Sequence, residues 1–456
     1  MRGVFSVDGR RVTVVGAARS GIAAAVLLAS RGAAVTLSDA RPMLADADRE
    51  RLAASGVALE LGGHERATFS GADLIVTSPG VPPELAELAA ARAAGVPVIG
   101  EVELAFRWLA GRVIAITGTK GKSTTTSLTG RMLRQAGLKV TVGGNIGAPI
   151  SAQVDDSTPD TLHVVEVSSF QLEQIETFRP WIAVMLNFSP DHLDRHHTVE
   201  AYGAAKARVF ENQQPTDFAV VNADDEPAVR LAAGTRAERR WFSRRGLRTD
   251  GTVIEDGWIV SRRDGRSERL VPLSSIRLLG EHLVDDVMAA ATVASLAGVA
   301  PAAITAAVES FGGLEHAMEL VADVDGVRFV NDSKATNVEA AVRSIESFQS
   351  GVVAIVGGKF KGGDLRLLRT PIGGRGKAVV AIGEAKALVR EALDDVIDVR
   401  DAASMDEAVE TAFELAKPTG VVVLAPACAS FDMFRDYAER GQRFKDAVQR
   451  LVASRA

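Results

Sequence analysis

The chain of 456 residues contains a single cysteine, Cys428, so it cannot form an internal disulfide bond. This excludes the disulfide frameworks that stabilise many small secreted proteins, and a lone thiol fits a reducing compartment. The start of the sequence also lacks a basic segment followed by an apolar run and a small-residue cleavage site, as a signal peptide would have. We therefore expect a cytoplasmic protein.

Long apolar runs and an excess of positive charge are missing as well. The longest apolar stretch near the start, Ile22 to Ala29, is too short to span a bilayer, which takes about 20 residues. Lys and Arg number 52 against 58 Asp and Glu, which gives a net charge of −6. We therefore expect neither membrane insertion nor nucleic-acid binding. A hydrophobic fraction of 47% is ordinary for a globular protein, and the length suggests about two to four domains.

The stretch VIAITGTKGKSTT, at residues 113–125, has the order strand, glycine loop, helix. Backbone N–H groups in such a loop, next to a helix N-terminus, bind anions. Lys122 would neutralise the β- and γ-phosphates of a nucleotide, and Ser123 would offer its hydroxyl to Mg²⁺. The first glycine of the common phosphate-loop pattern is replaced by Ile116, and Gly118 takes its place. We predict a nucleoside triphosphate site formed by Gly118, Thr119, Lys120, Gly121, Lys122, Ser123 and Thr124.

An earlier βαβ unit is predicted from a strand at residues 11–15, an alanine-rich helix reaching Ser30 and a second strand ending at Asp39. Its glycines, Gly16 and Gly21, have Ala18 where a dinucleotide-binding loop has a middle glycine. The unit is therefore either an NAD site or a Rossmann-like domain for another nucleotide, and we favour the second interpretation.

Three polar residues of the middle region stand out. Glu166 interrupts an apolar strand in HVVEVSSFQ, where it is either a metal ligand or half of a buried Glu–Arg pair. His192 lies in SPDHLDRHH, directly after a strand, and is either a metal ligand or part of a solvated loop. Lys206 is by default a solvated helix lysine. The charged segment 236–270 is interpreted as a surface hairpin without chemistry.

The last third contains short strands that are apolar on both faces, at residues 352–356, 378–382 and 421–424, each followed by a helix-like stretch. This pattern predicts a parallel, doubly wound sheet. Polar clusters follow the strands in NDSKATN at 331–337, GGKFKGG at 357–363 and PACASF at 426–431. Cys428 has no histidine beside it, so an inert buried thiol is favoured over a nucleophile.

Six strings occur together in one order: GTKGKSTT, GGNIG, EVSSFQLE, SPDHLDRH, NDSKATN and PACASFD. In their order and spacing the whole chain resembles the Mur ligase family of ATP-dependent amide-forming ligases. The resemblance implies an α/β fold of three domains. These are a Rossmann-like N-terminal domain for a UDP-sugar at residues 1–101, a central P-loop ATPase with a mostly parallel sheet at 102–312, and a Rossmann-like C-terminal domain for an amino acid at 313–456.

The strings are most similar to those of the family members that add D-glutamate to UDP-N-acetylmuramoyl-L-alanine through an acyl phosphate, in cytoplasmic peptidoglycan precursor synthesis. The resemblance thus implies a monomeric ligase that uses ATP and Mg²⁺ at two metal sites. A ligase for another amino acid such as L-glutamate, and a catalytically weak homologue with a regulatory role, are the alternatives. A NAD-dependent oxidoreductase would leave GTKGKSTT unexplained.

The resemblance also implies roles for individual residues. Lys122, Glu166, His192 and Lys206 would be catalytic, and Ser123, Glu166, His192 and Lys206 would hold metal, with Lys206 matching a lysine that CO₂ carbamylates. Asp286 and Asp332 would contact the nucleotide. The UDP moiety would bind to Arg19, Ser20, Asp39, Arg41 and Ser78, and the muramoyl-alanine end would contact Asn145 and Gln171. The amino acid would meet Lys334, Thr336, Lys361, Ser430 and Phe431.

The chain departs from the family pattern near the nucleotide. Leu283 and Asp286 stand where the family usually has two asparagines, and Ala317 stands where it usually has an arginine. Loss of a phosphate-binding arginine would cost about 1.5–3 kcal/mol of charged hydrogen bonding. We therefore expect an altered ATP subsite, or compensation by another cation: Arg277, Arg328 or Lys359.

Overall fold

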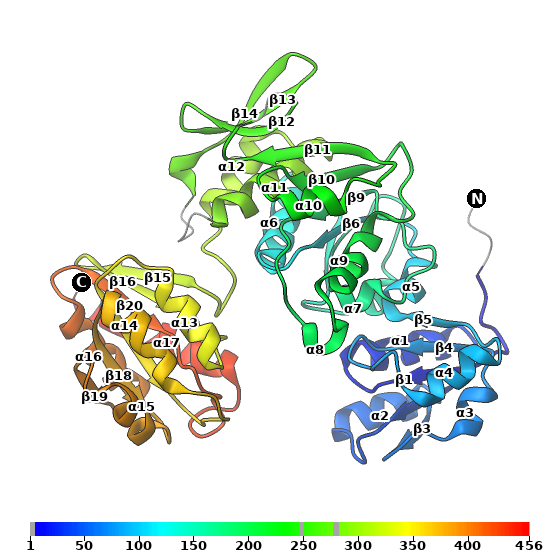
Figure 1. Cartoon of the computed structure of the whole chain (residues 1–456), viewed down its shortest axis with the longest axis horizontal. Helices are drawn as coiled ribbons and strands as arrows, with labels where there is room; N and C mark the ends of the chain where they lie inside the picture. Colours follow the sequence, from blue (N-terminus) through cyan, green and yellow to red (C-terminus); the bar gives the residue numbers. More distant parts are fainter. Residues whose placement is uncertain (1–4, 247–249, 277–281, 456) are drawn as a thin grey trace. The chain divides into compact units, whose positions relative to one another are not determined.

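The computed structural model describes residues 5–246, 250–276 and 282–455. The chain divides into two compact units, Met1–Ile276 with Asp285–Val308 and Arg277–Val284 with Glu309–Ala456. The first unit contains two sheets and the second unit contains one (Figure 1). Within the described residues no helix is long and apolar enough to cross a membrane.

The first sheet is parallel throughout and has the strand order β3-β2-β1-β4-β5. Its strands are β1 (Arg11–Val15), β2 (Ala34–Asp39), β3 (Ala58–Leu61), β4 (Leu74–Thr77) and β5 (Val98–Gly100). The helices between them are α1 (Arg19–Ser30), α2 (Asp46–Ala54), α3 (Arg66–Ser70) and α4 (Ala86–Ala93). Helix α5 (Glu101–Phe106) then connects this sheet to the next one. The predicted βαβ unit is thus confirmed.

The second sheet has nine strands in the order β14-β13-β12-β11-β10-β9-β6-β8-β7. Its parallel part consists of β6 (Arg112–Thr117), β7 (Val140–Gly144), β8 (Leu162–Glu166), β9 (Ile182–Met185), β10 (Phe218–Asn222), β11 (Glu238–Ser243) and β12 (Gly251–Glu255). Strand β13 (Trp258–Arg263) pairs antiparallel with β12, and β14 (Arg266–Pro272) pairs antiparallel with β13. The surface hairpin predicted at 236–270 is confirmed for β12 to β14, whereas β11 was not anticipated as a strand that pairs in register with β10 and continues the parallel sheet.

Helices and short 3₁₀ turns join these strands. They are α6 (Lys122–Gln135), η1 (Ile150–Gln153), α7 (Ser169–Leu172), α8 (Leu193–His196), α9 (Val199–Ala207), η2 (Arg208–Phe210), α10 (Glu226–Leu231), η3 (Leu273–Ser275), α11 (His282–Leu296) and α12 (Pro301–Glu309). Strand β6 lies between β8 and β9, and its residues from Val113 to Thr117 are buried. The phosphate loop therefore leaves from the interior of the sheet, where its position is fixed from both sides.

The sheet of the second unit has the order β15-β16-β20-β17-β18-β19, parallel except for β15. Its strands are β15 (Glu319–Val324), β16 (Val327–Asn331), β17 (Val352–Gly357), β18 (Gly376–Ile382), β19 (Val399–Asp401) and β20 (Gly420–Leu424). The helices are α13 (Val338–Glu346), η4 (Leu365–Leu368), α14 (Arg369–Arg375), α15 (Lys386–Leu393), α16 (Met405–Ala416) and α17 (Tyr437–Ala453).

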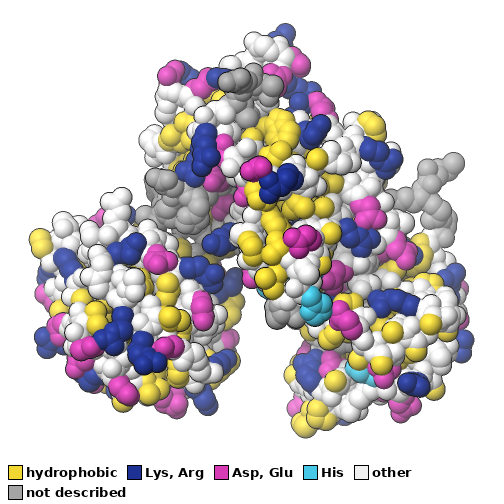
Figure 2. All heavy atoms as spheres, in the orientation of Figure 1, with side chains coloured by type: hydrophobic (Ala, Val, Ile, Leu, Met, Phe, Trp, Pro, Cys, Tyr) yellow, Lys and Arg dark blue, Asp and Glu magenta, His cyan; other side chains and the backbone are white. Residues whose placement is uncertain are grey.

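The inner parallel strands β17, β18 and β20 of the second unit are apolar on both sides because helices cover both faces of the sheet. One core packs α13, α14 and α15 against the sheet, and the other packs α16 and α17 against it. The predicted α/β class with three mostly parallel sheets is confirmed, whereas the exact domain boundaries stay a prediction. On the face in Figure 2, cationic and anionic side chains of the described residues are interspersed.

Candidate active site

The loop after β6 has the backbone geometry of an anion site. Gly118 and Gly121 have φ values of +153° and +80°, a region that L side chains rarely adopt. Helix α6 begins at Lys122, and no side chain of the described residues caps the N–H groups of its first turn. The side-chain oxygen of Asn187 accepts hydrogen bonds from the backbone N–H of Thr119 (3.1 Å) and Lys120 (2.9 Å). The loop is thus held in a shape that fits a phosphate group.

Two lysines meet at this loop. Lys122 Nζ donates to the carbonyl oxygens of Gly118 (3.0 Å) and Thr119 (2.8 Å), and Lys206 Nζ donates to the same Gly118 oxygen at 2.7 Å. Lys206 is only 1% exposed, so it is not the solvated helix lysine that its local sequence suggests. Burial, and then the charge of Lys122, lowers the pKa of Lys206 to about 7. A large share of its amine is therefore neutral near pH 7.

Glu166 ends β8 with a buried carboxylate that receives one hydrogen bond on each oxygen. Ser123 Oγ donates to Oε2 at 2.7 Å, and Asn145 Nδ2 donates to Oε1 at 2.7 Å. No arginine forms an ion pair with Glu166 in the part of the chain that the structure describes, so the alternative of a buried Glu–Arg pair is wrong. A carboxylate beside a serine hydroxyl is a donor set that Mg²⁺ accepts.

The same region offers few further metal ligands. Among the described residues no three His, Cys, Asp or Glu side chains gather closely enough to hold a metal ion by themselves. This agrees with Mg²⁺, which keeps several waters and is bound by one or two protein oxygens together with substrate phosphates. The residues present therefore fit a magnesium ion that arrives with a nucleotide.

His192 is placed less favourably than predicted. It has a left-handed backbone (φ 52°), a half-exposed side chain, and ring contacts to Phe170 (5.1 Å) and Tyr202 (6.1 Å). Within the described residues no hydrogen bond or ion pair joins its side chain to Glu166. The neighbouring Asp191 interacts electrostatically with both lysines at the loop, because its charge acts to raise the pKa of Lys122 and of Lys206.

Asp286, on α11, packs directly beneath the loop. A Cβ atom on Gly121 would lie 2.1 Å from Asp286 Oδ1, and Thr125 Oγ1 donates to that same oxygen at 3.2 Å. Oδ2 is buried and has no hydrogen-bond partner among the residues that the structure describes. Burial, assisted by the charge of Asp285, raises the pKa of Asp286 well above its usual value. The carboxyl is therefore favoured in its neutral form, with a hydrogen-bonding capacity closer to that of the family asparagine. Leu283 lies on the same helix, and Arg277 lies outside the described residues.

Replacing Asp286 by asparagine is expected to stabilise the protein more as the pH rises. The folded state keeps the Asp286 proton to a higher pH than the unfolded chain does, so the wild type loses stability as pH rises above the unfolded pKa. Asparagine cannot ionise, and we expect it to gain about 1–3 kcal/mol at pH 8. Thermal unfolding at about pH 5 and pH 8 measures this. Asp394→Asn, at an exposed ion pair, is the control, and an equal gain at both pH values would contradict the assignment.

In the first sheet, the predicted UDP contacts gather at the carboxyl ends of β1, β2 and β4. Asp39 accepts the backbone N–H of Ala17 (2.5 Å) and forms a two-point ion pair with Arg41 (3.0 Å for each contact). Burial opposes ionisation, but these hydrogen bonds lower the pKa of Asp39 to about 2. Ser78 Oγ donates to the carbonyl of Gly16 at 2.9 Å. Arg19 and Ser20 lie in the first turn of α1, which begins at the same edge.

Gln171 is buried and already engaged. Its side-chain oxygen accepts the backbone N–H of Ser168 at 3.0 Å, and Ser168 Oγ accepts the N–H of Gln171 at 3.2 Å. This capping box starts α7. The side-chain oxygen of Gln171 is thus occupied by hydrogen bonds within the protein. Among the described residues, its side-chain NH₂ group has no hydrogen-bond partner.

In the second unit, three loops after neighbouring strands bring the remaining predicted residues together. Ala427 N–H donates to Ala335 O at 3.0 Å, and Lys359 exchanges backbone hydrogen bonds with Ala429 (2.8 and 3.0 Å). The loops that these bonds connect carry Lys334, Thr336, Lys361, Ser430 and Phe431. Lys361 Nζ lies 5.0 Å from the centre of the exposed Phe431 ring.

Asp332 begins the first of these loops and is buried. Its carboxylate accepts the N–H of Met318 at 3.2 Å and a hydrogen bond from Ser344, while burial raises its pKa. Ala317 precedes Met318, and no side chain at position 317 replaces the family arginine. Arg328 and Lys359 both belong to the second unit.

Two residues that hold these sites in place were missed. Asn187 braces the phosphate loop, and its position two residues after the end of β9 was the available signal. Arg440, on α17, is fully buried and donates to Ser333 Oγ (3.0 Å), Ser333 O (2.9 Å) and Cys428 O (3.0 Å). Nothing in the local sequence separates Arg440 from a surface helix arginine. Cys428 itself is buried, and burial raises its pKa to about 11, as an inert thiol requires.

Comparison with known proteins relates the whole chain to one family. The family profiles described as "Mur ligase MurD-like, N-terminal domain", "Mur ligase middle domain" and "Mur ligase, glutamate ligase domain" match residues 10–100, 116–294 and 317–428. The UDP-N-acetylmuramoylalanine–D-glutamate ligase of Acidobacterium capsulatum is 50% identical, with 97% of each chain covered. The protein of that name from Koribacter versatilis is 46% identical, with 98% of this chain and 99% of that protein covered.

The fold agrees with this relationship. The UDP-N-acetylmuramate–alanine ligase of Thermotoga maritima superimposes with a TM-score of 0.56 at 17% identity, covering 98% of this chain and all of that one. At this identity the likeness concerns the fold alone. Three matching profiles and full-length relatives at 46–50% identity decide the matter: the chain belongs to the Mur ligase family.

Proposed function

We propose that this protein is an ATP-dependent ligase that joins D-glutamate to UDP-N-acetylmuramoyl-L-alanine, through an acyl-phosphate intermediate, in cytoplasmic peptidoglycan precursor synthesis. One observation carries the proposal. The phosphate loop is in contact with Lys122 and Lys206 and lies beside the Glu166–Ser123 pair. The relatives of this chain that are 43–50% identical over nearly its full length are named for this reaction.

The proposed ATP site is the loop of residues 118–124 with the first turn of α6. Lys122 would exchange its hydrogen bonds to the Gly118 and Thr119 carbonyls for phosphate oxygens, and Asp286 would support the loop from below. Asp332 is proposed as a further nucleotide contact. Ser123 and Glu166 would hold Mg²⁺, which supplies charge neutralisation at the transferring phosphoryl group.

A second metal site is proposed with His192 and a carbamylated Lys206 as ligands. The amine of Lys206 has the low pKa that reaction with CO₂ needs, since only the neutral form is a nucleophile. Carbamylation would convert this buried cation into a carboxylate next to Lys122. His192 would have to move toward Glu166, because its ring now packs on Phe170.

The chemistry needs positioning and charge stabilisation rather than a protein nucleophile. The carboxylate of the UDP-sugar substrate attacks the γ-phosphate, and the amine of D-glutamate then displaces phosphate from the acyl phosphate. Lys122 and the amides of the α6 N-terminus stabilise the charge that develops on the phosphoryl oxygens. Asn145, which is bonded to Glu166, is proposed to orient the alanyl end together with Gln171.

The two other substrates are assigned to the first sheet and to the sheet of the second unit. Arg19, Ser20, Asp39, Arg41 and Ser78 are proposed to bind the UDP moiety. Lys334, Thr336, Lys361, Ser430 and Phe431 are proposed to bind D-glutamate, whose two carboxylates need cations and hydroxyl groups. The corresponding domains would be residues 1–101, 102–312 and 313–456, each of which contains one of the matched profiles. We propose that the protein acts as a monomer.

Phosphate release from ATP tests the function directly. With Mg²⁺ and UDP-N-acetylmuramoyl-L-alanine present, we expect release to require D-glutamate and to stay at background with L-glutamate or with no amino acid. The physical reason is that the acyl phosphate turns over only when an amine in the correct position displaces phosphate. Coupled detection of phosphate gives the rate.

The other outcomes are equally informative. Release with L-glutamate or another amino acid would retain the ligase mechanism and replace the proposed substrate. No release with any amino acid, from folded protein that still binds the UDP-sugar, would favour the catalytically weak homologue. Leu283, Asp286 and Ala317 would then be the positions to restore to the family residues.

A further inference from the structure

A cavity of about 1010 Å³ in the first unit lies at the edge of the second sheet opposite the phosphate loop. Arg112 opens β6, while Trp181 and Asp217 directly precede β9 and β10, so the cavity is at the amino ends of these strands. The phosphate loop leaves the other end of β6, and a strand of six residues rises about 20 Å. The cavity is therefore separate from the nucleotide site.

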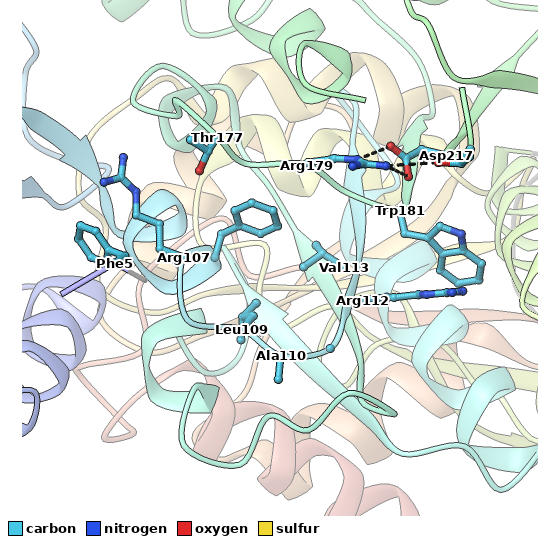
Figure 3. Close-up of a pocket in the computed structure, with 13 residues that line it drawn as sticks. Phe5, Arg107, Leu109, Ala110, Arg112, Val113, Thr177, Arg179, Trp181 and Asp217 are labelled. Carbon is cyan, nitrogen blue, oxygen red and sulfur yellow. Dashed lines mark hydrogen bonds and ion pairs between the residues drawn. The ribbon is translucent and has the colours of Figure 1, made fainter. Parts of the chain in front are cut away.

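The cavity has an apolar floor between two aromatic walls. Figure 3 shows Phe5 with Arg107 on one side and Trp181 with Arg112 on the other, with Leu109, Ala110 and Val113 between them. The guanidinium of Arg107 lies 4.7 Å from the Phe5 ring centre, and that of Arg112 lies 4.6 Å from the ring centre of Trp181. A planar apolar molecule would contact side chains on several sides.

Hydrogen bonds within the protein hold the walls of the cavity in place. Glu103 Oε2 accepts the backbone N–H groups of Glu176, Thr177 and Phe178, each at 2.9 Å. These bonds fix the segment that carries Thr177 against α5, which leads into Arg107. A preformed wall lowers the entropic cost of binding.

The charges in the cavity are unequal. Arg107 pairs with Glu103 (2.9 Å) and Glu176 (2.5 Å), and Arg179 pairs with Asp217 at 2.6 Å. Arg112 makes no ion pair with any carboxylate of the described residues. Its stacked guanidinium keeps the N–H groups at its edge free for a carboxylate or sulfonate. The cavity thus carries one uncompensated cation beside an apolar surface.

We propose that this cavity is a binding site for a small aromatic anion, whose ring lies on the apolar floor and whose acidic group pairs with Arg112. A pocket of this size with a few polar groups is typical of small-molecule sites. Arg112, which stacks on Trp181 and has no ion pair among the described residues, favours a ligand with one negative charge. The site is independent of the proposed ligase activity, because none of its residues belongs to the phosphate loop.

The test uses the full chain and 2-naphthoate as the probe, with binding followed by isothermal titration. We expect saturable binding at about millimolar concentration or tighter, which is reasonable for a ligand of this size. Arg112→Ala should weaken it about tenfold or more, and the neutral 2-naphthamide should bind weaker by a similar factor. Arg269→Ala removes a comparable arginine–tryptophan pair outside the cavity, over Trp258 at 5.4 Å, and should change nothing.

Saturating ATP should not displace the probe, because the two sites lie at opposite edges of the sheet. Displacement by ATP, equal binding of the amide, equal weakening by both arginine variants, or no saturable binding would each overturn the proposal. Thermal unfolding of Arg112→Ala checks its fold, and the comparison of acid with amide needs no variant.

Discussion

Replacing Lys206 by alanine is expected to lower ATP-dependent phosphate release about a thousandfold, the range seen when one group that stabilises developing charge is removed. Lys206 is buried, hydrogen-bonded to Gly118 O at 2.7 Å, and its pKa is lowered to about 7 by burial and by Lys122. Above pH 7 its neutral amine can attack CO₂ and form a carbamate, which releases one proton. The variant would lose both the proposed carbamate and the hydrogen bond to the loop carbonyl.

The carbamate has a signature of its own. With ¹³C-labelled bicarbonate, wild-type protein should show a carbamate carbon resonance that is absent from Lys206→Ala. Lys206→Arg keeps a cation and a donor for Gly118 but cannot be carbamylated, and we expect it to be as inactive as the alanine variant. Lys139→Ala, at an exposed lysine bonded to Thr158, is the matched control. An active arginine variant would show that the residue acts as a cation instead.

The fold follows from the sequence because parallel sheets covered on both faces leave a simple signal. Short runs that are apolar at every position, such as those of β6 and β17, predict strands directly, and each is followed by a polar loop and a helix. That β11 was not anticipated within 236–270 has a physical cause. Strand β11 has the sequence ERRWFS and is half exposed near the edge of the parallel part, so its composition resembles that of a surface loop.

Site residues that directly follow a strand could be predicted from the sequence. Site residues whose properties depend on burial in the folded protein could not. The loop glycines and Lys122 are visible in the sequence, and so is Glu166, since a carboxylate inside an apolar strand needs an explanation. The burial of Lys206 is invisible, because helix α9 carries no local signal for which face is covered. The raised pKa of Asp286 depends on the packing of α11 beneath Gly121, which only tertiary structure supplies.

Replacing Lys122 by alanine is expected to reduce the turnover number for phosphate release by about 10²–10³-fold, while affinity for the UDP-sugar stays unchanged. In the free protein Lys122 Nζ is satisfied by the carbonyls of Gly118 and Thr119, and burial lowers its pKa. A phosphate group would favour the charged form and draw the ammonium away from these carbonyls. The lysine thus contributes most when negative charge develops on the γ-phosphate.

The variant should therefore lose turnover rather than affinity for the UDP-sugar. Without the ammonium, the helix amides still attract phosphate, but nothing neutralises the oxygens of the transferring group. Steady-state phosphate release, with ATP and UDP-sugar binding measured separately by titration, distinguishes the two effects. Lys122→Arg should recover only part of the rate, because a planar fork replaces a compact charge in a loop shaped by two left-handed glycines. If Lys122→Ala kept more than about a tenth of the wild-type turnover, another group would stabilise the charge of the transferring phosphoryl group. Lys206, which is hydrogen-bonded to the same Gly118 carbonyl, would be the next candidate.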